Sequence, residues 1–456
     1  MKMMLSACAD SVQGKLIGID TIFSAVSIDT RTLQPGALYI AIQGKQFDGH
    51  DFIAAAEQAG AIAVLVHKTV ETTLPQIKVA DTHLALAELA GTWRHKLSLQ
   101  VVGITGSNGK TTVKEMTAAI LGASTSPDQV LYTQGNLNND IGVPLTLLRL
   151  TDAHRYAVIE MGANHPGEIR YTSHYAAADV VILNNAGAAH LEGFHDLEGV
   201  AQAKAEIIET LHADGVAILN RDDVYFDYWK SVAADRKILT FGFSETAEIS
   251  ARDIQTQIGA KGFVTRFRLL TPQADTTCDI SLAGKHNVLN ALAATAAALA
   301  LNIDLAQIIQ GLALVKPVTG RLQLLRGVMG NCIIDDTYNA NAASLQAALA
   351  VLSEYGGQTW LALGAFGETG KDSAKIHHDV GLLIKNSGVT RLYATGAEAQ
   401  HTVSAFGEGG YFFTEQNALI TALKAELKGN ETLLVKGSRS QRMENVVAAL
   451  VENFRN

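Results

Sequence analysis

The residues with the clearest chemical potential form a glycine-rich stretch in the first third of the chain. The stretch GITGSNGKTT spans Gly103 to Thr112, between the apolar run VVGIT and the helix-like run TVKEMTAAILG. The commonest phosphate loop, G-x-x-x-x-G-K-[ST], has a glycine six residues before its lysine, where this chain has Ile104. Backbone N–H groups at a turn from strand to helix can still receive a phosphate, so we predict a phosphate site here.

Each part of this loop has a predicted role. We expect Lys110 to neutralise the outer phosphates of a nucleotide and the hydroxyl of Thr111 to occupy a ligand position of Mg²⁺. The alternative is a glycine turn with an accidental Gly-Lys-Thr, but strand, loop and helix occur in the order that a phosphate site requires. The predicted nucleotide contacts in this loop are Gly106, Ser107, Asn108, Gly109, Lys110, Thr111 and Thr112.

Two further side chains follow apolar strands of the same region. The strand-like run YAVIE ends in Glu160, and DVVILNNAG leads on to His190. Ligands of open α/β sheets bind at the carboxyl ends of the strands, so both side chains are expected to face the phosphate loop. A structural role for either residue stays open at this point.

Lys204 lies in the helix-like run GVAQAKAEIIETL. Its neighbours at one helical turn are Val200, Ile207 and Ile208, which puts the lysine on the apolar stripe without a carboxylate three or four residues away. A lysine that extends its amine to the surface is one interpretation. The other is a buried amine with a lowered pKa, which could add CO₂ and become an anionic carbamate near the metal.

Three asparagines follow the strand-like run VLYT. In TQGNLNNDIGVP, Asn136, Asn138 and Asn139 offer neutral donors and acceptors for a polar, charged substrate. Asparagine is also a common turn residue, so the pattern leaves substrate binding and loop structure as alternatives.

The elements that must position these residues predict an α/β protein of three domains. Short apolar runs and the helix LALAELAGTWRHKL predict a small α/β unit at residues 1–98. Strands that alternate with helices predict a mostly parallel sheet at 99–314, and the same alternation recurs at 315–456. At about 150 residues per domain, the length of 456 residues fits this division.

Composition excludes several classes of function. The chain is 48% hydrophobic and 18% charged, and its net charge of -9 argues against general binding of nucleic acid or anionic membranes. We find no apolar run near the roughly 18 residues of a membrane span, and the LSAC sequence at Cys8 lacks the apolar segment of a lipidation signal. The cysteines, Cys8, Cys278 and Cys332, favour a reducing, cytoplasmic location.

A set of motifs resembles the Mur ligases of bacterial cell-wall synthesis. The resemblance covers essentially the whole chain, in order, and includes TGSNGKTT, GNLNNDIGVP, AHLEGFHDLEGVAQAK, GKHNVLNALAA, PVTGRLQ, DDTYNAN and VKGSR. The sequence TGxxGKT alone is typical of the wider superfamily. GNLNNDIGVP together with DDTYNAN is similar to the members that add D-alanyl-D-alanine.

The resemblance implies site residues in all three domains. It implies a UDP-sugar domain, a central ATPase domain and a C-terminal Rossmann-like domain for the amino component. Glu160, His190 and Lys204 match the family's Mg²⁺ ligands, and Lys204 matches its carbamylated lysine. The implied UDP contacts are Asp29, Thr30, Arg31, Asp48 and His50. The implied nucleotide contacts beyond the loop are Asn287, Arg321, Asp336 and Asn339, and the implied substrate contacts near the third domain are Lys436, Ser438 and Arg439.

The implied reaction is ATP-dependent amide formation between UDP-MurNAc-tripeptide and D-alanyl-D-alanine, with ATP and two Mg²⁺ ions, by a cytoplasmic monomer. Three positions depart from the family pattern: Ala342 replaces a frequent proline, and Ala365 and Phe366 stand where LGDMGELG has an acid and its neighbour. Alternatives are a diaminopimelate- or lysine-adding ligase, folylpolyglutamate synthase, and a nucleotide switch without ligase activity. The DNPR motif of the diaminopimelate-adding members is absent.

Overall fold

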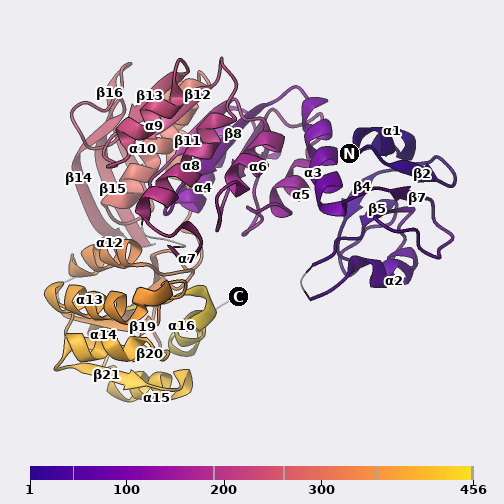
Figure 1. Cartoon of the computed structure of the whole chain (residues 1–456). Helices are drawn as coiled ribbons and strands as arrows, with labels where there is room; N and C mark the ends of the chain where they lie inside the picture. The colour runs from indigo at the N-terminus through magenta and orange to yellow at the C-terminus, as the bar shows by residue number, and fades with distance from the viewer. Residues whose placement is uncertain (45, 188–190, 260–261, 355–356, 453–456) are drawn as a thin grey trace.

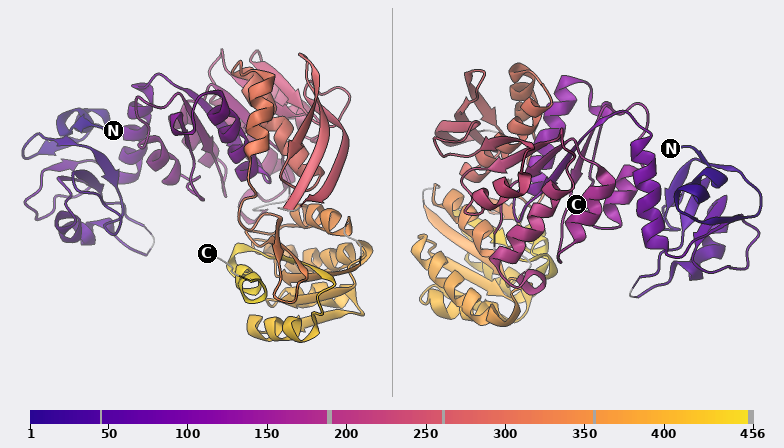
Figure 2. Two further views of the ribbon diagram at one scale, coloured as in Figure 1. Left: turned by 180° about the vertical axis from the view of Figure 1, so that it is seen from behind. Right: turned by 45° about the horizontal axis from the view of Figure 1, so that its top comes forward.

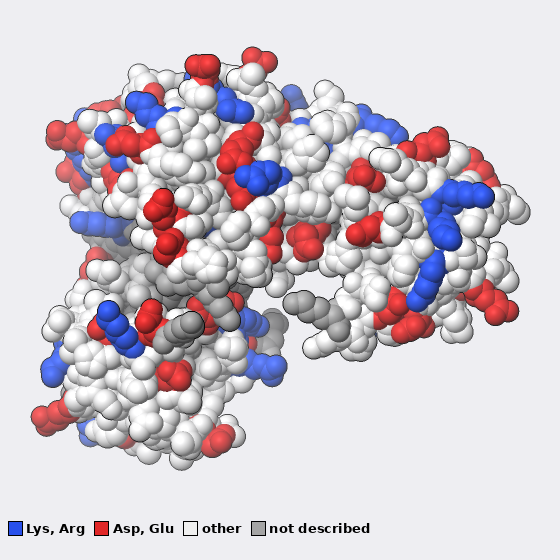
Figure 3. Space-filling view, viewed as in Figure 1, with Lys and Arg blue, Asp and Glu red and all other residues white. Residues whose placement is uncertain are grey.

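The computed structural model contains an N-terminal, a central and a C-terminal region, each built on α/β structure (Figure 1). The N-terminal and C-terminal regions lie at opposite ends of the central region, and the space-filling view shows an open notch between them (Figure 3). The α/β class predicted from the sequence is confirmed. Among the described residues, no helix is long and apolar enough to span a membrane. The structure describes residues 1–44, 46–187, 191–259, 262–354 and 357–452.

The N-terminal region is built on a five-stranded sheet with the order β2-β7-β6-β5-β4. Its neighbours are parallel except β2 and β7, and every residue of β5 and β6 is buried, as their apolar sequences require. The strands are β2 (Lys15–Ile17), β4 (Ala25–Ser27), β5 (Ala37–Ile40), β6 (Ala63–Val66) and β7 (Gln76–Lys78). Around them lie the antiparallel pair β1 (Met3–Met4) and β3 (Ile22–Phe23) and the helices α1 (Leu5–Ser11), η1 (Gly49–Phe52) and α2 (Ile53–Gln58).

Helix α3 (Thr82–His95) joins the N-terminal region to the central region. The carboxylate of Asp81 accepts hydrogen bonds from the first turn and so fixes where the helix begins. The helix packs on α5 (Gly142–Leu147) and α6 (Glu168–Ala176) of the central region. At its end, the buried guanidinium of Arg94 donates to backbone carbonyls that follow both α3 and α6.

One hydrophobic core extends through this joint. Leu38 of the N-terminal sheet, Leu89 of α3 and Ile159 of the central sheet belong to the same cluster of fully buried side chains. The two regions are therefore held together by packing as well as by the chain that connects them.

The central region contains a six-stranded, fully parallel sheet with the order β13-β12-β11-β8-β10-β9. Its strands are β8 (Gln100–Thr105), β9 (Val130–Tyr132), β10 (Tyr156–Glu160), β11 (Val180–Leu183), β12 (Val216–Asn220) and β13 (Lys237–Phe241). The other helical elements are α4 (Lys110–Ser124), η2 (Pro127–Gln129), α7 (Leu191–Phe194), α8 (Leu197–Glu209), α9 (Phe226–Ala233), α10 (Lys285–Ala300) and α11 (Leu305–Leu314). The parallel sheet and the strand ends at the glycine loop and at Glu160 agree with the sequence-based predictions.

A three-stranded antiparallel sheet, which we did not predict, packs on α10 and α11. It consists of β14 (Ser250–Gly259), β15 (Gly262–Leu270) and β16 (Asp275–Ile280). Along β15, buried and exposed side chains alternate, so one face covers the helices while ion pairs such as Arg266 with Asp279 lie on the other.

The C-terminal region has a six-stranded sheet with the order β17-β18-β22-β19-β20-β21, in which only β17 is antiparallel to its neighbour. The strands are β17 (Gln323–Arg326), β18 (Cys332–Asp336), β19 (Gln358–Gly364), β20 (Arg391–Thr395), β21 (Gly410–Phe413) and β22 (Glu431–Lys436). The helical elements are α12 (Ala342–Ser353), η3 (Gly370–Asp372), α13 (Ser373–Asn386), α14 (Ala399–Phe406), α15 (Gln416–Glu426), η4 (Arg439–Gln441) and α16 (Glu444–Leu450).

The C-terminal region packs against the antiparallel sheet of the central region. Phe263 of β15 and Ala283, which precedes α10, belong to the same buried cluster as Leu345 and Val351 of α12. The views from the front and from behind both show α12 beneath this sheet (Figures 1 and 2). This packing brings the amino-terminal end of α12 close to the phosphate loop.

Candidate active site

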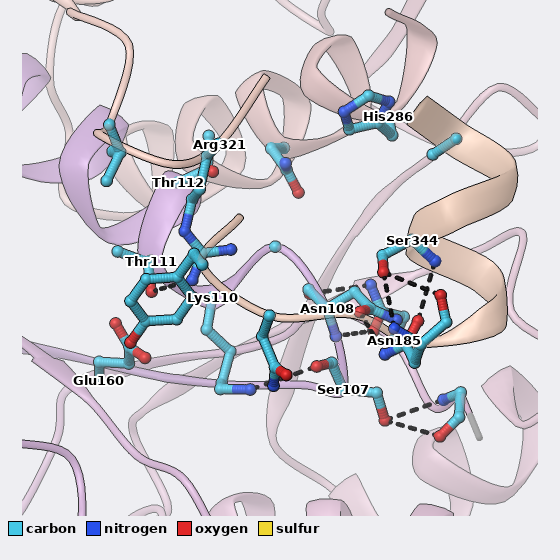
Figure 4. Close-up of a pocket in the computed structure, with 18 of the residues that line it drawn as sticks. Ser107, Asn108, Lys110, Thr111, Thr112, Glu160, Asn185, His286, Arg321 and Ser344 are labelled. Atoms are coloured by element: carbon cyan, nitrogen blue, oxygen red, sulfur yellow. Dashed lines mark hydrogen bonds between the residues drawn. The ribbon is translucent and has the colours of Figure 1, made fainter. Parts of the chain in front are cut away.

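A cavity of about 580 Å³ lies between the central and C-terminal regions (Figure 4). The phosphate loop and the start of α4 form one wall, and the segments before β17 and after β18 face them from the C-terminal region. The predicted residues that line it are Ser107, Asn108, Gly109, Lys110, Thr111, Thr112, Asn136, Asn138, Asn139, Glu160, Asn287, Arg321, Asp336, Asn339 and Lys436.

The backbone conformation at Gly109 explains why the loop has a glycine there. Gly109 has a φ of 81°, where side chains are disfavoured, and an added Cβ would lie 2.4 Å from Oδ1 of Asn290. A side chain at this position would strain the backbone and displace the amide of Asn290. Sequence reasoning placed the turn correctly but could not identify this neighbour.

The second half of the loop supplies the free N–H groups. The backbone N–H of Ser107 donates to the carbonyl of Asn185, and that of Asn108 donates to Oδ1 of Asn185. The first turn of α4, which begins at Lys110, has no intrahelical acceptor for its N–H groups and is the positive end of the helix dipole. An anion therefore has its donors at residues 109–112.

Lys110 folds back over its own loop. Its Nζ donates to the carbonyl of Gly106 at 2.6 Å and to that of Ser107 at 3.3 Å. Burial lowers the pKa of Lys110, which the charge of Glu160 opposes. The amine thus lies within reach of the loop that carries the free donors.

Glu160 is a buried carboxylate with one free oxygen. Its backbone N–H is fixed by the hydroxyl of Thr133, and Nδ2 of Asn138 donates to Oε1 at 2.9 Å. Oε2 is buried and has no hydrogen-bond partner among the described residues. A buried carboxylate oxygen without a donor is suited to a cation.

Lys204 is buried, which agrees with the second of the two interpretations of its place on the apolar stripe. Its side chain is 1% exposed, and Nζ lies 5.5 Å from the ring centroid of Phe194 without a hydrogen-bond partner among the described residues. Burial, together with the charge of Lys110, lowers the pKa of Lys204 to about 7, against the opposing effect of Glu206. A neutral amine is therefore accessible near neutral pH.

Arg321 reaches across the cavity to the phosphate loop. Its Nη2 donates to the hydroxyl of Thr111 at 3.1 Å, over a sequence separation of 210 residues. The guanidinium carbon of Arg321 lies over the ring of Tyr338, 4.2 Å from the ring centroid, in a cation–π contact. Figure 4 shows Arg321, Thr111, Lys110 and Glu160 grouped at one end of the cavity.

Asp336, Lys436 and Asn339 form a single cluster at the ends of β18 and β22. The amine of Lys436 lies 2.5 Å from Oδ2 of Asp336 and donates to the carbonyl of Asn339. The side chain of Asn339 accepts from the backbone N–H of Arg439. Neither Ser438 nor Arg439 lines the cavity, although both were predicted near the substrate.

The N-terminal candidates lie outside this cavity. Arg31 forms a salt bridge with Asp29, and Asp48 contacts both His50 and Lys68. The N-terminal region, which carries these residues, lies across the notch from the C-terminal region (Figure 3). Their predicted contact with a UDP group, and that of Thr30, stays a prediction. His190 falls outside the described residues, so its predicted role also stays a prediction.

The positions that depart from the family pattern are structural. Phe366 is buried, packs against His377, and donates its backbone N–H to the imidazole at 3.0 Å. Ala365 is buried beside it, and Ala342 is the first residue of α12. None of the three contributes a polar group to the cavity.

Sequence reasoning missed several lining residues. Burial lowers the pKa of His286 to about 4, so its imidazole is neutral where it faces Asp336 and Lys436. Asn185 fixes the loop, and only its position after β11 could have indicated this. The other missed polar residues that line the cavity include Glu115, Asn164, Glu168, Asn290, Lys316, Tyr338, Asn341 and Ser344.

Comparison with known proteins identifies the family. Residues 23–94, 104–298 and 320–439 match models described as "Mur ligase family, catalytic domain", "Mur ligase middle domain" and "Mur ligase, glutamate ligase domain". The UDP-N-acetylmuramoyl-tripeptide--D-alanyl-D-alanine ligase of Escherichia coli is 44% identical over 452 residues, which is 98% of each chain. The chain belongs to the Mur ligase family.

Solved structures agree with this Mur ligase in fold. A crystal structure of MurF from Acinetobacter baumannii matches with a TM-score of 0.92 at 34% identity, over 98% of both chains. MurF ligase from Thermotoga maritima in complex with ADP matches with a TM-score of 0.83 at 29% identity, over 93% of this chain and 96% of that one.

Proposed function

We propose that this Mur ligase joins D-alanyl-D-alanine to UDP-N-acetylmuramoyl-tripeptide in an ATP-dependent reaction of peptidoglycan synthesis. The observation that carries the proposal is the shared cavity, where the phosphate loop meets Arg321 and Asp336 of the C-terminal region. The choice of substrates rests on the Escherichia coli ligase, which is similar over nearly the full length.

The chemistry requires activation of a carboxylate. The terminal carboxylate of the tripeptide attacks the γ-phosphate of ATP, and ADP leaves with the electrons of the broken P–O bond. The amine of the dipeptide then adds to the acyl phosphate, loses a proton, and expels inorganic phosphate to give the amide. The protein mainly positions the reactants and stabilises charge. Lys110 and Arg321 lie where they can offset repulsion between the carboxylate and the phosphates.

Oxygen atoms that suit Mg²⁺ as ligands lie near the phosphate loop. Oε2 of Glu160 is buried without a partner in the described part of the chain, and the hydroxyl of Thr111 lies at the start of α4. Among the described residues, no three His, Cys, Asp or Glu side chains form a metal cluster by themselves. From the free oxygens above, we assign Glu160 and Thr111 as ligands of one ion, and His190 and a modified Lys204 as ligands of a second ion. Bound Mg²⁺ would neutralise the phosphate charge.

The carbamate of Lys204 would explain why a lysine occupies this buried position. A neutral amine can add CO₂ and lose a proton, which creates an anion that binds Mg²⁺. The burial of Nζ, its lack of a hydrogen-bond partner among the residues that the structure describes, and its lowered pKa support the modification.

We further propose the division 1–98, 99–314 and 315–456 for binding the UDP group, ATP and the dipeptide. The separate sheets of the three regions support it. Asn287 would face the adenine from α10, and Asn136 and Asn139 would contact the tripeptide from the cavity wall. Lys436, Ser438 and Arg439 would lie near the incoming dipeptide. A cytoplasmic monomer completes the proposal.

The deciding experiment is phosphate release from ATP and Mg²⁺ with UDP-MurNAc-tripeptide, with and without D-alanyl-D-alanine, followed by mass analysis of the product. Release that needs both substrates and yields the pentapeptide supports the proposal. Release with diaminopimelate, lysine or a folate as the productive substrate instead would assign another ligase of the superfamily. Nucleotide hydrolysis that no acceptor changes would favour a nucleotide switch.

The carbamate has its own test. Lys204→Ala should abolish turnover, and short carboxylic acids should restore part of it, whereas Lys230→Ala, at an exposed lysine of α9, should match the unmodified protein. Normal turnover by Lys204→Ala would rule the carbamate out.

A further inference from the structure

Asn341 connects the C-terminal region to the phosphate loop through both ends of one side chain. It is the N-cap of α12: its Oδ1 accepts from the backbone N–H of Ser344 at 2.8 Å. Because Oδ1 is committed to the cap, Nδ2 points away from the helix, where it donates to Oδ1 of Asn108 at 2.9 Å. This hydrogen bond joins two residues that are 233 positions apart in the sequence and that both line the cavity.

Asn108 is held by several hydrogen bonds within the central region. Its N–H donates to Oδ1 of Asn185, and its carbonyl accepts from the side chains of Asn184 and Asn185. Asn184 also contacts Asn290 of α10. The backbone of Asn108 is therefore occupied within the central region, and its side chain remains for the contact with Asn341.

The contact is distinct from the one that Arg321 makes. Arg321 bonds the hydroxyl of Thr111, which is itself a candidate metal ligand, so this contact must adapt when phosphates and a cation bind. Asn341 instead contacts the side chain of Asn108, which precedes the residues 109–112 that carry the free N–H groups. The amide pair therefore uses none of the backbone donors that an anion needs.

We propose that Asn341 is a positioning residue that couples docking of the C-terminal region to the conformation of the phosphate loop. Docking brings Nδ2 to Asn108 and holds the loop, through Asn184 and Asn185, in its nucleotide-binding form. Coupling between sites is reciprocal, so a nucleotide must also favour docking. The inference deepens the proposed ligase function, but the coupling itself requires only a nucleotide and the protein.

Asn341→Ser separates the two roles of the residue. Serine is a good N-cap, so α12 keeps its start, but its hydroxyl is too short to reach Asn108. We expect a similar melting temperature and an affinity for ADP that is about three- to tenfold weaker by calorimetry, the usual effect of one hydrogen bond. Scattering with ADP should show a more extended particle than the unmodified protein. Asn417→Ser, at an exposed position of α15, is the matched control and should change neither quantity.

The double variant Asn108→Ala/Asn341→Ser tests whether the coupling depends on the hydrogen bond between these two side chains. If the amide pair carries the coupling, the second substitution adds little to the effect of Asn108→Ala on ADP affinity. Fully additive effects, or unchanged ADP affinity in Asn341→Ser, would overturn the inference. Should Asn341→Ser fail to fold, Asn108→Ala alone must weaken ADP binding and extend the particle, and its failure to do so would be equally decisive. A wrong choice of ligase substrates would leave these binding results unaffected.

Discussion

Lys436 and Asp336, which lie 100 residues apart, form a buried ion pair between the ends of two adjacent strands of the C-terminal sheet. Asp336 also accepts from the backbone N–H of Leu322, and Lys436 donates to the carbonyl of Asn339. The pair therefore connects β22, β18 and the segment that carries Arg321. It fixes the wall of the cavity that faces the phosphate loop.

Removing one partner of this pair should be strongly destabilising. In Lys436→Met, Asp336 remains buried without its cation, and we expect the free energy of unfolding to fall by about 3–5 kcal/mol. Urea unfolding monitored in the C-terminal region measures this. The double variant Lys436→Met/Asp336→Leu, which removes both charges, should recover most of the loss. A loss below about 1 kcal/mol in the single variant would contradict a tight pair.

Arg321→Ala should impair turnover more than folding. The guanidinium is the cation that the C-terminal region presents to Thr111, and loss of one such donor typically lowers kcat about 10²- to 10³-fold. Arg321→Lys should retain part of the rate, because it keeps the charge but loses the planar fork that lies against Tyr338. Steady-state kinetics should show no change for Arg326→Ala, at an exposed position on β17.

Asn138→Ala should leave the carboxylate of Glu160 less well oriented. The Mg²⁺ concentration needed for half-maximal activity should therefore rise. Asn138 orients the carboxylate through Oε1, and loss of such a support usually costs about 10- to 100-fold in metal affinity. Titration of activity with Mg²⁺ measures the effect. Gln134→Ala, at an exposed position of the same loop, is the control. An identical Mg²⁺ curve would show that Asn138 does not orient the ligand.

Lys204 predicts a specific dependence of stability on pH. The pKa of Lys204 is about 7 in the folded chain and 10.5 without the burial, so between these values the unfolded chain binds more protons. Stability should therefore rise with pH across this window, and the full cost, about 3–5 kcal/mol, applies below pH 7.

The apolar variant Lys204→Met isolates this effect. In CO₂-free buffer, it should be more stable than the unmodified protein at pH 7, and the difference should shrink as the pH rises towards 10. Thermal unfolding at a series of pH values measures both. A difference that stays constant with pH would mean that the amine does not titrate in this window.

Local patterns were sufficient to predict the elements that carry the site. The run from Gly103 to Thr112 contains its strand, turn and helix signals within a few residues. The apolar spacing around Lys204 made a buried amine one of two interpretations. The β14–β16 sheet was missed because its sequence is rich in polar residues on the exposed face, which weakens the apolar signal of each strand.

Contacts between distant residues could not be predicted from the chain alone. Nothing near Asn108 or Asn341 in sequence indicates that the two side chains meet, because that depends on how α12 packs on the antiparallel sheet. The same holds for Asn185, which accepts hydrogen bonds from N–H groups in the first half of the loop. It also holds for the neutral state of His286, which follows from burial.

The unbroken core through α3 has a consequence for how the chain is made. Because Leu38, Leu89 and Ile159 share one core, the N-terminal sheet cannot complete its burial until the central strands have left the ribosome. The C-terminal region is synthesised last and has a buried cluster of its own, which includes Trp360 and Leu433. The first two regions therefore leave the ribosome before the wall that closes the cavity, and Phe263 and Ala283 lack their partners on α12 until that helix follows.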